Sequence, residues 1–391
     1  MSTDPLGTLE PMTKDVAPIT LQEYQDRIDK ARKLMSESQI EAIYLESGAG
    51  LYYFTGVRWG RSERMLAAVI PANGEIAYVC PAFEEQRFRE QVLLGQDIRV
   101  WEEDESPYQL VAQVLEDRDI GAGRIGIEES VRFFLYDGIC KEAHHLEFVS
   151  ADPVTIPCRV IKSPAEIALM QRANDITIAA YKVCVSMLQE GMSQDELRAL
   201  SRRVYKALGV QGGIDFQFGA STAFPHGSKE LLHLKEGDVV LMDSVCNVEG
   251  YHSDISRTIV FGEPTQRQRD VWDLEHKAQA AAFAAAQVGV PCEDVDAAAR
   301  KVITDAGFGP DYQVPGLPHR TGHGIGLEIH EWVHLVRGNK TPIAPGMCFT
   351  NEPMIAIYGE FGVRLEDCMY ITEDGPRFFS QPSPSIEQPF A

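Results

Sequence analysis

Residues 239–260 constrain the fold of this chain more than any other segment. A run of four apolar residues ends at Asp243, and a second run rich in β-branched residues surrounds Asp254, eleven residues further along. Between them, residues 247–250 contain asparagine, glutamate and glycine, which are typical of a turn. The pattern predicts a β-hairpin that returns the second aspartate to the first.

Three further polar residues stand in comparable surroundings. His323 lies in a Gly-His-Gly-Ile-Gly loop, where glycine permits a close approach of the backbone. Glu352 and Glu366 each lie within or at the end of an apolar strand, and a buried acid needs a partner cation. A single acid more often caps a turn or pairs with an arginine, but the joint arrangement favours one shared site.

The residue types indicate which ligand such a site takes. Hard divalent cations prefer carboxylate oxygens, one imidazole adds affinity, and carboxylates can bridge two ions about 3.5 Å apart. The sequence therefore predicts a two-metal hydrolytic centre with five protein ligands, namely Asp243, Asp254, His323, Glu352 and Glu366.

The segments around these residues resemble the metal-dependent M24 or "pita-bread" peptidases, a family that holds methionine aminopeptidase, aminopeptidase P and prolidase. The resemblance rests on residues 243–258, 322–331, 351–353 and 363–367. It implies an α/β creatinase-like N-terminal domain followed by an α+β pita-bread catalytic domain. It also implies two divalent metal ions per subunit, with manganese expected and cobalt or zinc as alternatives.

The same resemblance implies catalytic roles for further side chains. His226, His319 and His330 match histidines of the proline-directed branch, and Arg364 completes that set. Each histidine alone is more often a core residue, but four matches together favour the site. A metal-activated hydroxide would attack the amide while Glu352 relays the proton. His330 and His226 would donate hydrogen bonds to the intermediate, and His319 would support the leaving group.

Substrate class follows from the domain layout that the resemblance implies. Methionine aminopeptidases usually lack the long N-terminal domain, so short proline-containing peptides are the expected substrates. With its length and one N-terminal domain the chain resembles the shorter bacterial prolidases, which implies an Xaa-Pro dipeptidase, with an Xaa-Pro aminopeptidase acting on longer peptides as the alternative. A catalytically inactive pita-bread binding protein is a third possibility, disfavoured because every ligand is present.

Residues 57–62 form a candidate substrate-binding loop. Trp59 and Arg61 lie in it, and the arginine could meet a dipeptide carboxylate in a neighbouring subunit's pocket as a charge-assisted pair. A solvated loop is the alternative. The family resemblance implies a homodimer.

A length of 391 residues suits two domains. We expect a leader over 1–19, the N-terminal domain over 20–155 and the catalytic domain over 156–391. Prolines 153, 157 and 164 interrupt the pattern near the boundary. In the first domain, short apolar runs alternate with helix-like stretches. The runs predict strands at 42–45, 65–70, 76–79, 98–101 and 125–127.

Helical patterns appear in both domains. Apolar spacing predicts helices over 21–35, 83–91, 108–116, 266–288 and 295–306. Ser163 and Ser193 are each followed three residues later by glutamate, the reciprocal capping arrangement at a helix start.

Charge and cysteine usage exclude several classes. The net charge of −22 repels phosphate backbones and anionic lipids, so neither a nucleic acid nor a membrane is an expected partner. Eight scattered cysteines without a C-x-x-C pair indicate reduced core thiols. No secretory signal is visible in residues 1–19, and we expect a cytoplasmic protein.

Overall fold

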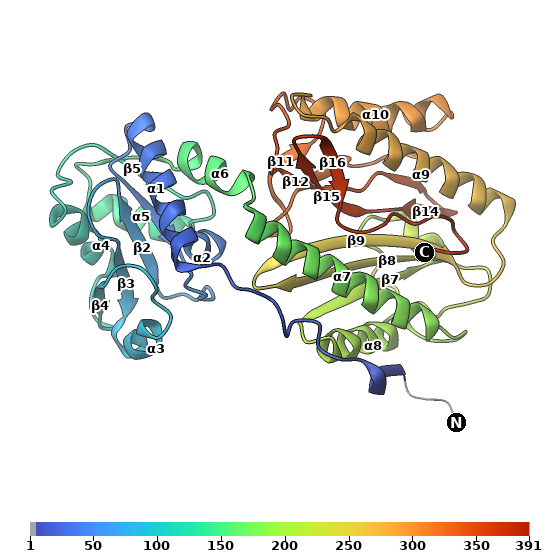
Figure 1. The fold of residues 1–391 in the computed structure, drawn as a ribbon, viewed down its shortest axis with the longest axis horizontal. Coiled ribbons are helices and arrows are strands. Elements are labelled where there is room, and N and C mark those ends of the chain that lie inside the picture. Colours follow the sequence, from blue (N-terminus) through green and yellow to red (C-terminus); the bar gives the residue numbers. More distant parts are fainter. Residues whose placement is uncertain (1–4, 391) are drawn as a thin grey trace. The chain divides into compact units, whose positions relative to one another are not determined.

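The computed structural model describes residues 5–390 and divides the chain into two compact units (Figure 1). One unit is Ile19–Arg159. The other begins at Val160 and also includes the N-terminal segment up to Pro18. In the described part of the chain, no helix combines the length and hydropathy that a membrane crossing requires.

The N-terminal unit is built on a six-stranded mixed sheet in the order β4-β3-β2-β1-β5-β6. Strands β1 to β3 are completely buried, as expected for runs that are apolar on both faces. The five predicted strands are confirmed, and β6 was not predicted because both its ends are exposed. The strands are β1 (Ala42–Glu46), β2 (Ala67–Pro71), β3 (Ala77–Pro81), β4 (Asp97–Trp101), β5 (Arg124–Ile127) and β6 (Glu147–Ser150).

Helices separate these strands except at β2 and β3, which pair directly as a hairpin, and the predicted α/β class is confirmed. They are α1 (Leu21–Ser38), α2 (Ala49–Thr55), η2 (Ala82–Glu84), α3 (Glu85–Arg89), α4 (Pro107–Glu116), α5 (Phe133–Glu142) and α6 (Asp152–Val160). The predicted helix over 83–91 is shorter than expected, and its first turn is a 3-10 helix.

Helix α6 forms where prolines were expected to interrupt the pattern. Pro157 lies inside it and removes one backbone hydrogen bond. Val154 and Cys158 are completely buried one turn apart, so packing offsets the loss. The helix therefore continues through the predicted boundary at 155/156 and ends at Val160.

The second unit, in which the sequence places the catalytic domain, contains antiparallel sheets and four long helices. Its three-stranded sheet has the order β7-β8-β9, a five-stranded sheet has the order β11-β10-β12-β15-β16, and β13 pairs with β14. The strands are β7 (Gly212–Phe218), β8 (Val239–Val248), β9 (Tyr251–Val260), β10 (Gly322–Gly324), β11 (Glu331–Leu335), β12 (Cys348–Asn351), β13 (Met354–Ile357), β14 (Phe361–Arg364), β15 (Asp367–Thr372) and β16 (Gly375–Phe378).

Capping explains where the helices of this unit begin. Both predicted reciprocal caps are present, at Ser163 and Ser193, and Thr265 forms a third with Gln268. Helix α7 runs along β8 and β9, and α9 lies beside α10 (Figure 1). The helices are α7 (Pro164–Ser186), α8 (Gln194–Ala207), α9 (Gln266–Ala285) and α10 (Cys292–Asp305), with short 3-10 turns η1 (Pro5–Thr8) and η3 (Gly219–Ala223).

The segment predicted as a leader packs on this unit from residue 5 onward. The Met12 amide donates to the carbonyl of Leu208 at 2.9 Å, and Asp15 pairs with Arg172 at 3.1 Å. These contacts lie in the part of residues 1–19 that the structure describes.

A completely buried ion pair joins β9 to β15. Arg257 donates to Asp367 at 2.7 Å and to the carbonyl of Glu366 at 2.8 Å, and both charged side chains are 0% exposed. Removing one partner of such a pair leaves an uncompensated buried charge. This ion pair therefore holds the strand that contains Asp254 against the segment that contains Glu366.

We expect Arg257→Met to lower the free energy of unfolding by about 3–5 kcal/mol, because Asp367 would remain buried without its cationic partner. Chemical denaturation measures this free energy of unfolding for the wild type and the variant. The double variant Arg257→Met with Asp367→Asn should lose less than the single variant. The half-exposed pair Arg267 and Glu360 provides the control, where Arg267→Met should cost less than about 1 kcal/mol. Equal losses at the two arginines would contradict the role of the buried pair.

Candidate metal centre

The predicted hairpin is formed by β8 and β9 and positions two of the predicted ligands. Glu249 and Gly250 have φ values of 51° and 84°, the positive values that a tight hairpin turn needs. Asp243 pairs with Ser256, and Asp254 lies two residues before that serine. Residues two apart on a strand share a face, so both aspartates point to the same side of the sheet.

The other three predicted ligands come from the five-stranded sheet and its edges. His323 is the central residue of β10, Glu352 directly follows β12, and Glu366 lies between β14 and β15. His323 Nδ1 lies 3.0 Å from the Gly324 carbonyl, which is the second partner that orients a metal-binding imidazole. Its Nε2 then faces the acids, 3.2 Å from Glu352 Oε1 and 3.8 Å from Asp254 Oδ2.

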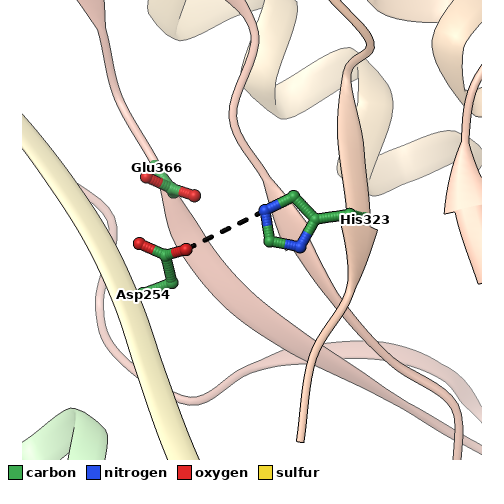
Figure 2. A group of neighbouring side chains, drawn as sticks. All are labelled: Asp254, His323 and Glu366. Carbon is green, nitrogen blue, oxygen red and sulfur yellow. Dashed lines mark ion pairs between the residues drawn. The ribbon is translucent and has the colours of Figure 1, made fainter. Parts of the chain in front are cut away.

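The structure brings all five predicted ligands together. Donor atoms of Asp254, His323 and Glu366 lie within 4.8 Å of one another (Figure 2). Glu352 contacts His323 of this group at 3.2 Å. Asp243 is linked to Glu366 by the Ser256 hydroxyl, which lies 3.5 Å from Asp243 and 2.7 Å from Glu366.

Burial and mutual repulsion dominate the electrostatics of this cluster. Burial raises the pKa of Asp254 and of Glu366 well above their ordinary values, and the neighbouring carboxylates raise them further. Burial also raises the pKa of Glu352 to about 7 and lowers that of His323 to about 3. A neutral imidazole among several carboxyl groups fits divalent cations well.

Two hydroxyl residues that the sequence analysis missed support the ligands. Ser256 donates to Glu366 and accepts from Arg364 Nε at 2.9 Å. Thr350 accepts from the His323 amide at 3.1 Å and donates to Glu352 at 3.3 Å. Each lies two residues from a ligand on a strand, so strand alternation was the signal that could have found them.

Arg364 contacts the ligand cluster directly. Its Nη2 donates to Asp243 Oδ2 at 2.6 Å, its Nη1 donates to the Pro225 carbonyl at 3.2 Å, and its side chain is 4% exposed. A guanidinium held in this way orients the aspartate and offsets one negative charge.

Of the three predicted catalytic histidines, His330 lies beside His323, His319 is turned inward, and His226 is exposed in the turn after η3. The His330 ring is centred 4.2 Å from that of His323, and burial together with the charges of Arg320 and His226 lowers the pKa of His330. His319 Nδ1 lies 2.7 Å from the Arg320 carbonyl, and its buried Nε2 has no partner among residues 5–390. Burial lowers the pKa of His319 to about 4, so this imidazole is neutral at pH 7.

The two predicted substrate-binding residues belong to the N-terminal unit. Trp59 and Arg61 line a hollow of about 350 Å³ in that unit. Arg61 donates to the Ser47 carbonyl at 3.0 Å and to the Ser130 hydroxyl at 2.5 Å, and Trp59 stacks with Arg87. The Arg61 guanidinium is therefore already held by partners of its own unit.

Known families match both units. The Creatinase/Prolidase N-terminal domain matches residues 27–161, and Metallopeptidase family M24 matches residues 168–373. The chain is similar to an uncharacterized peptidase of Schizosaccharomyces pombe, with 35% identity over 93% of this chain and 82% of the relative.

Two further similarities cover nearly the whole of both proteins. The Xaa-Pro dipeptidase of Pyrococcus furiosus is 30% identical over 90% of this chain and 97% of its own length. A solved dipeptidase from Mycobacterium ulcerans superposes with a TM-score of 0.85 at 29% identity, covering 93% of this chain and 97% of that one. With these matches and a cluster of carboxylates and histidine in the matched domain, this chain belongs to metallopeptidase family M24.

Proposed function

We propose that this protein is an Xaa-Pro dipeptidase that hydrolyses the amide bond before proline with two divalent cations. The observation that carries the proposal is the convergence of Asp254, Glu366 and a neutral His323, with Glu352 3.2 Å from His323 and Asp243 linked to Glu366 through Ser256. The Pyrococcus furiosus relative, which matches across both units, is named for this activity. Membership of family M24 implies divalent metal ions, and we propose manganese, with cobalt or zinc as alternatives.

The donor set and the surrounding residues support a hydrolytic reaction. Bound cations would supply an acidified water and polarise the scissile carbonyl. Glu352, 3.2 Å from His323, would relay the proton in addition to its place in the ligand shell. Asp243, Asp254, His323 and Glu366 would complete the ligand shell.

Three histidines and one arginine would act on the substrate and the ligands. His330 and His226 would donate hydrogen bonds to the oxyanion that develops on the carbonyl. If the Nδ1 of His319 donates to the Arg320 carbonyl, its Nε2 is unprotonated and can accept a hydrogen bond. His319 would use this nitrogen to support the site near the leaving group. Arg364 would hold Asp243 in place through their 2.6 Å hydrogen bond.

Two other functions compete with this proposal. An Xaa-Pro aminopeptidase would use the same centre on longer peptides, and the ligand geometry suits both reactions. An inactive binding protein on this fold is disfavoured because all five ligand positions retain metal-binding side chains.

Several expectations stay predictions. A homodimer, and the roles of Trp59 and Arg61 in binding substrate from a neighbouring subunit, rest on the resemblance. The eight free thiols, seven of them buried, support the proposed cytoplasmic location because thiols stay reduced in that compartment.

Purified protein supplied with Mn²⁺ should release proline from Ala-Pro and Gly-Pro and leave Arg-Pro-Pro intact. Chromatography of the free amino acids measures both reactions. Removal of arginine from Arg-Pro-Pro at a comparable rate would shift the assignment to an aminopeptidase, and exhaustively chelated protein that kept full activity would refute a metal mechanism.

Removing the cations should make stability depend on pH. The folded state raises the pKa of Glu352 from 4.5 to about 7, so it binds a proton more tightly than the unfolded chain does. The contribution to stability is thus greatest below pH 4.5 and is lost as the pH rises through about 7. Mn²⁺ should therefore raise the melting temperature of the metal-free protein more at pH 8 than at pH 5. Equal shifts at the two pH values would contradict this account.

His330→Gln should lower kcat by about 100-fold, because one donor to the developing oxyanion is lost. Its affinity for Mn²⁺ should stay within about threefold of the wild type, since none of the five proposed ligands is altered. Steady-state kinetics and metal titration measure the two quantities. The exposed His145 provides a control in His145→Gln, and loss of Mn²⁺ binding in His330→Gln would make His330 a ligand instead.

A further inference from the structure

A buried ion pair anchors the segment that presents His330. Lys162 Nζ donates to Glu331 Oε2 at 2.9 Å, and the two side chains are 2% and 5% exposed. Glu331 directly follows His330 and begins β11, whereas Lys162 lies 169 residues earlier, just before α7. The pair therefore ties the His330 segment to a part of the same unit that is far away in the sequence.

The Glu331 carboxylate also contacts the loop that carries His330. Its Oε1 accepts from the Glu328 amide at 3.1 Å, while its Oε2 accepts from Lys162. Gly326 lies near the start of the loop and leaves no room for a side chain, because a Cβ there would be 2.8 Å from Glu331 Oε2 and 2.9 Å from Lys162 Cε. The ion pair is thus in contact with both ends of this loop.

The Lys162 end of the pair is fixed by the backbone. Its amide donates to the Gly346 carbonyl at 2.8 Å. Ser163, the next residue, is the reciprocal N-cap of α7, and the capping partner Glu166 accepts from the Tyr251 hydroxyl on β9 at 2.9 Å. The ammonium group therefore extends from a well-anchored part of the fold and can position the segment that it contacts.

His330 depends on such support because its own side chain is exposed. An exposed imidazole gains little from packing, so its position follows from the backbone that carries it. Its ring is centred 4.2 Å from that of the proposed ligand His323, while the adjacent Glu331 is directed to Lys162. The two neighbours thus link the metal centre on one side to a buried anchor on the other.

Burial makes this ion pair an inefficient source of stability. Two charges removed from water lose hydration that their attraction only partly replaces, and an apolar pair of similar size often stabilises a protein as well or better. A charge-assisted hydrogen bond, however, fixes the distance and direction between two groups more strictly than an apolar contact does. The pair is therefore better suited to fixing geometry than to adding stability.

We propose that Lys162 is a positioning residue for catalysis, which acts through Glu331 to hold His330 at the metal centre. This inference rests on the proposed function, in which His330 donates to the developing oxyanion. Without Lys162 the buried Glu331 carboxylate would lose its cation, turn toward water and displace the His330 backbone. A small displacement lowers the rate, since a donor to an oxyanion is effective only at about 2.7–3.1 Å.

A double-variant cycle in the full chain separates positioning from a general structural role. With saturating Mn²⁺, we expect Lys162→Met to lower kcat for Ala-Pro on the order of 10- to 100-fold and to change KM less than about threefold. In protein that already carries His330→Gln, the same substitution should change kcat less than about threefold, because the group that Lys162 positions is absent. Additive effects of the two substitutions on kcat would overturn the inference.

Two control variants account for the stability that Lys162→Met also loses. Lys162→Met combined with Glu331→Gln removes the unpaired charge, so it should regain the denaturation midpoint and keep the low kcat. Recovery of kcat together with the midpoint would overturn the inference. Arg132→Met removes a guanidinium 2.6 Å from the buried Glu46 in the N-terminal unit, and it should lower the midpoint while kcat stays within about twofold of the wild type.

NMR of isotope-labelled histidine gives a readout that needs no turnover. Zn²⁺-loaded protein is used because Zn²⁺ does not broaden the signals as paramagnetic Mn²⁺ does, and the ring signal of His330 is assigned by its loss in His330→Gln. Lys162→Met should shift that signal and leave the signal of the exposed His145 in place. An unshifted His330 signal would overturn the positioning role. A wild type that cleaves neither Ala-Pro nor Gly-Pro refutes the dipeptidase function instead, and the His330 signal still decides the role of Lys162.

Discussion

Repulsion among the clustered carboxylates of the metal centre is the constraint on which the rest of the catalytic unit depends. Asp254 and Glu366 are almost completely buried, and their pKa values are raised by burial and by neighbouring carboxylates. Holding such groups together is unfavourable until cations bind. The surrounding structure must therefore be rigid enough to keep the ligands in place, and the fold supplies that rigidity from two sheets.

The rigidity comes from buried polar contacts that cross between elements. Arg257 ties β9 to the start of β15, and Ser256 links Asp243 to Glu366 across the same junction. On the other side, Arg300 and Asp296 hold the loop before His323. Each contact joins a ligand-bearing segment to a neighbouring element, and a metal site requires surroundings that hold its ligands in place.

Local patterns predicted the parts of the structure that local interactions decide. The hairpin of β8 and β9 was predictable because its turn needs residues that accept positive φ, and the caps at Ser163 and Ser193 because a side chain three residues on completes them. Helix α6 was not predicted, because the packing of its buried face outweighs the effect of Pro157. The resemblance to the pita-bread peptidases predicted the fold class and the family, and both are confirmed.

The sequence by itself determined the kinds of donor atoms, their strand and loop settings and the family, because these follow from residue types at short spacings. Only the tertiary structure decided that Ser256 and Thr350 support the ligands, and that Arg364 is committed to Asp243. The physical reason is that hydrogen bonds and ion pairs depend on distances of a few ångströms between residues far apart in the chain. Spacing along the sequence does not specify those distances.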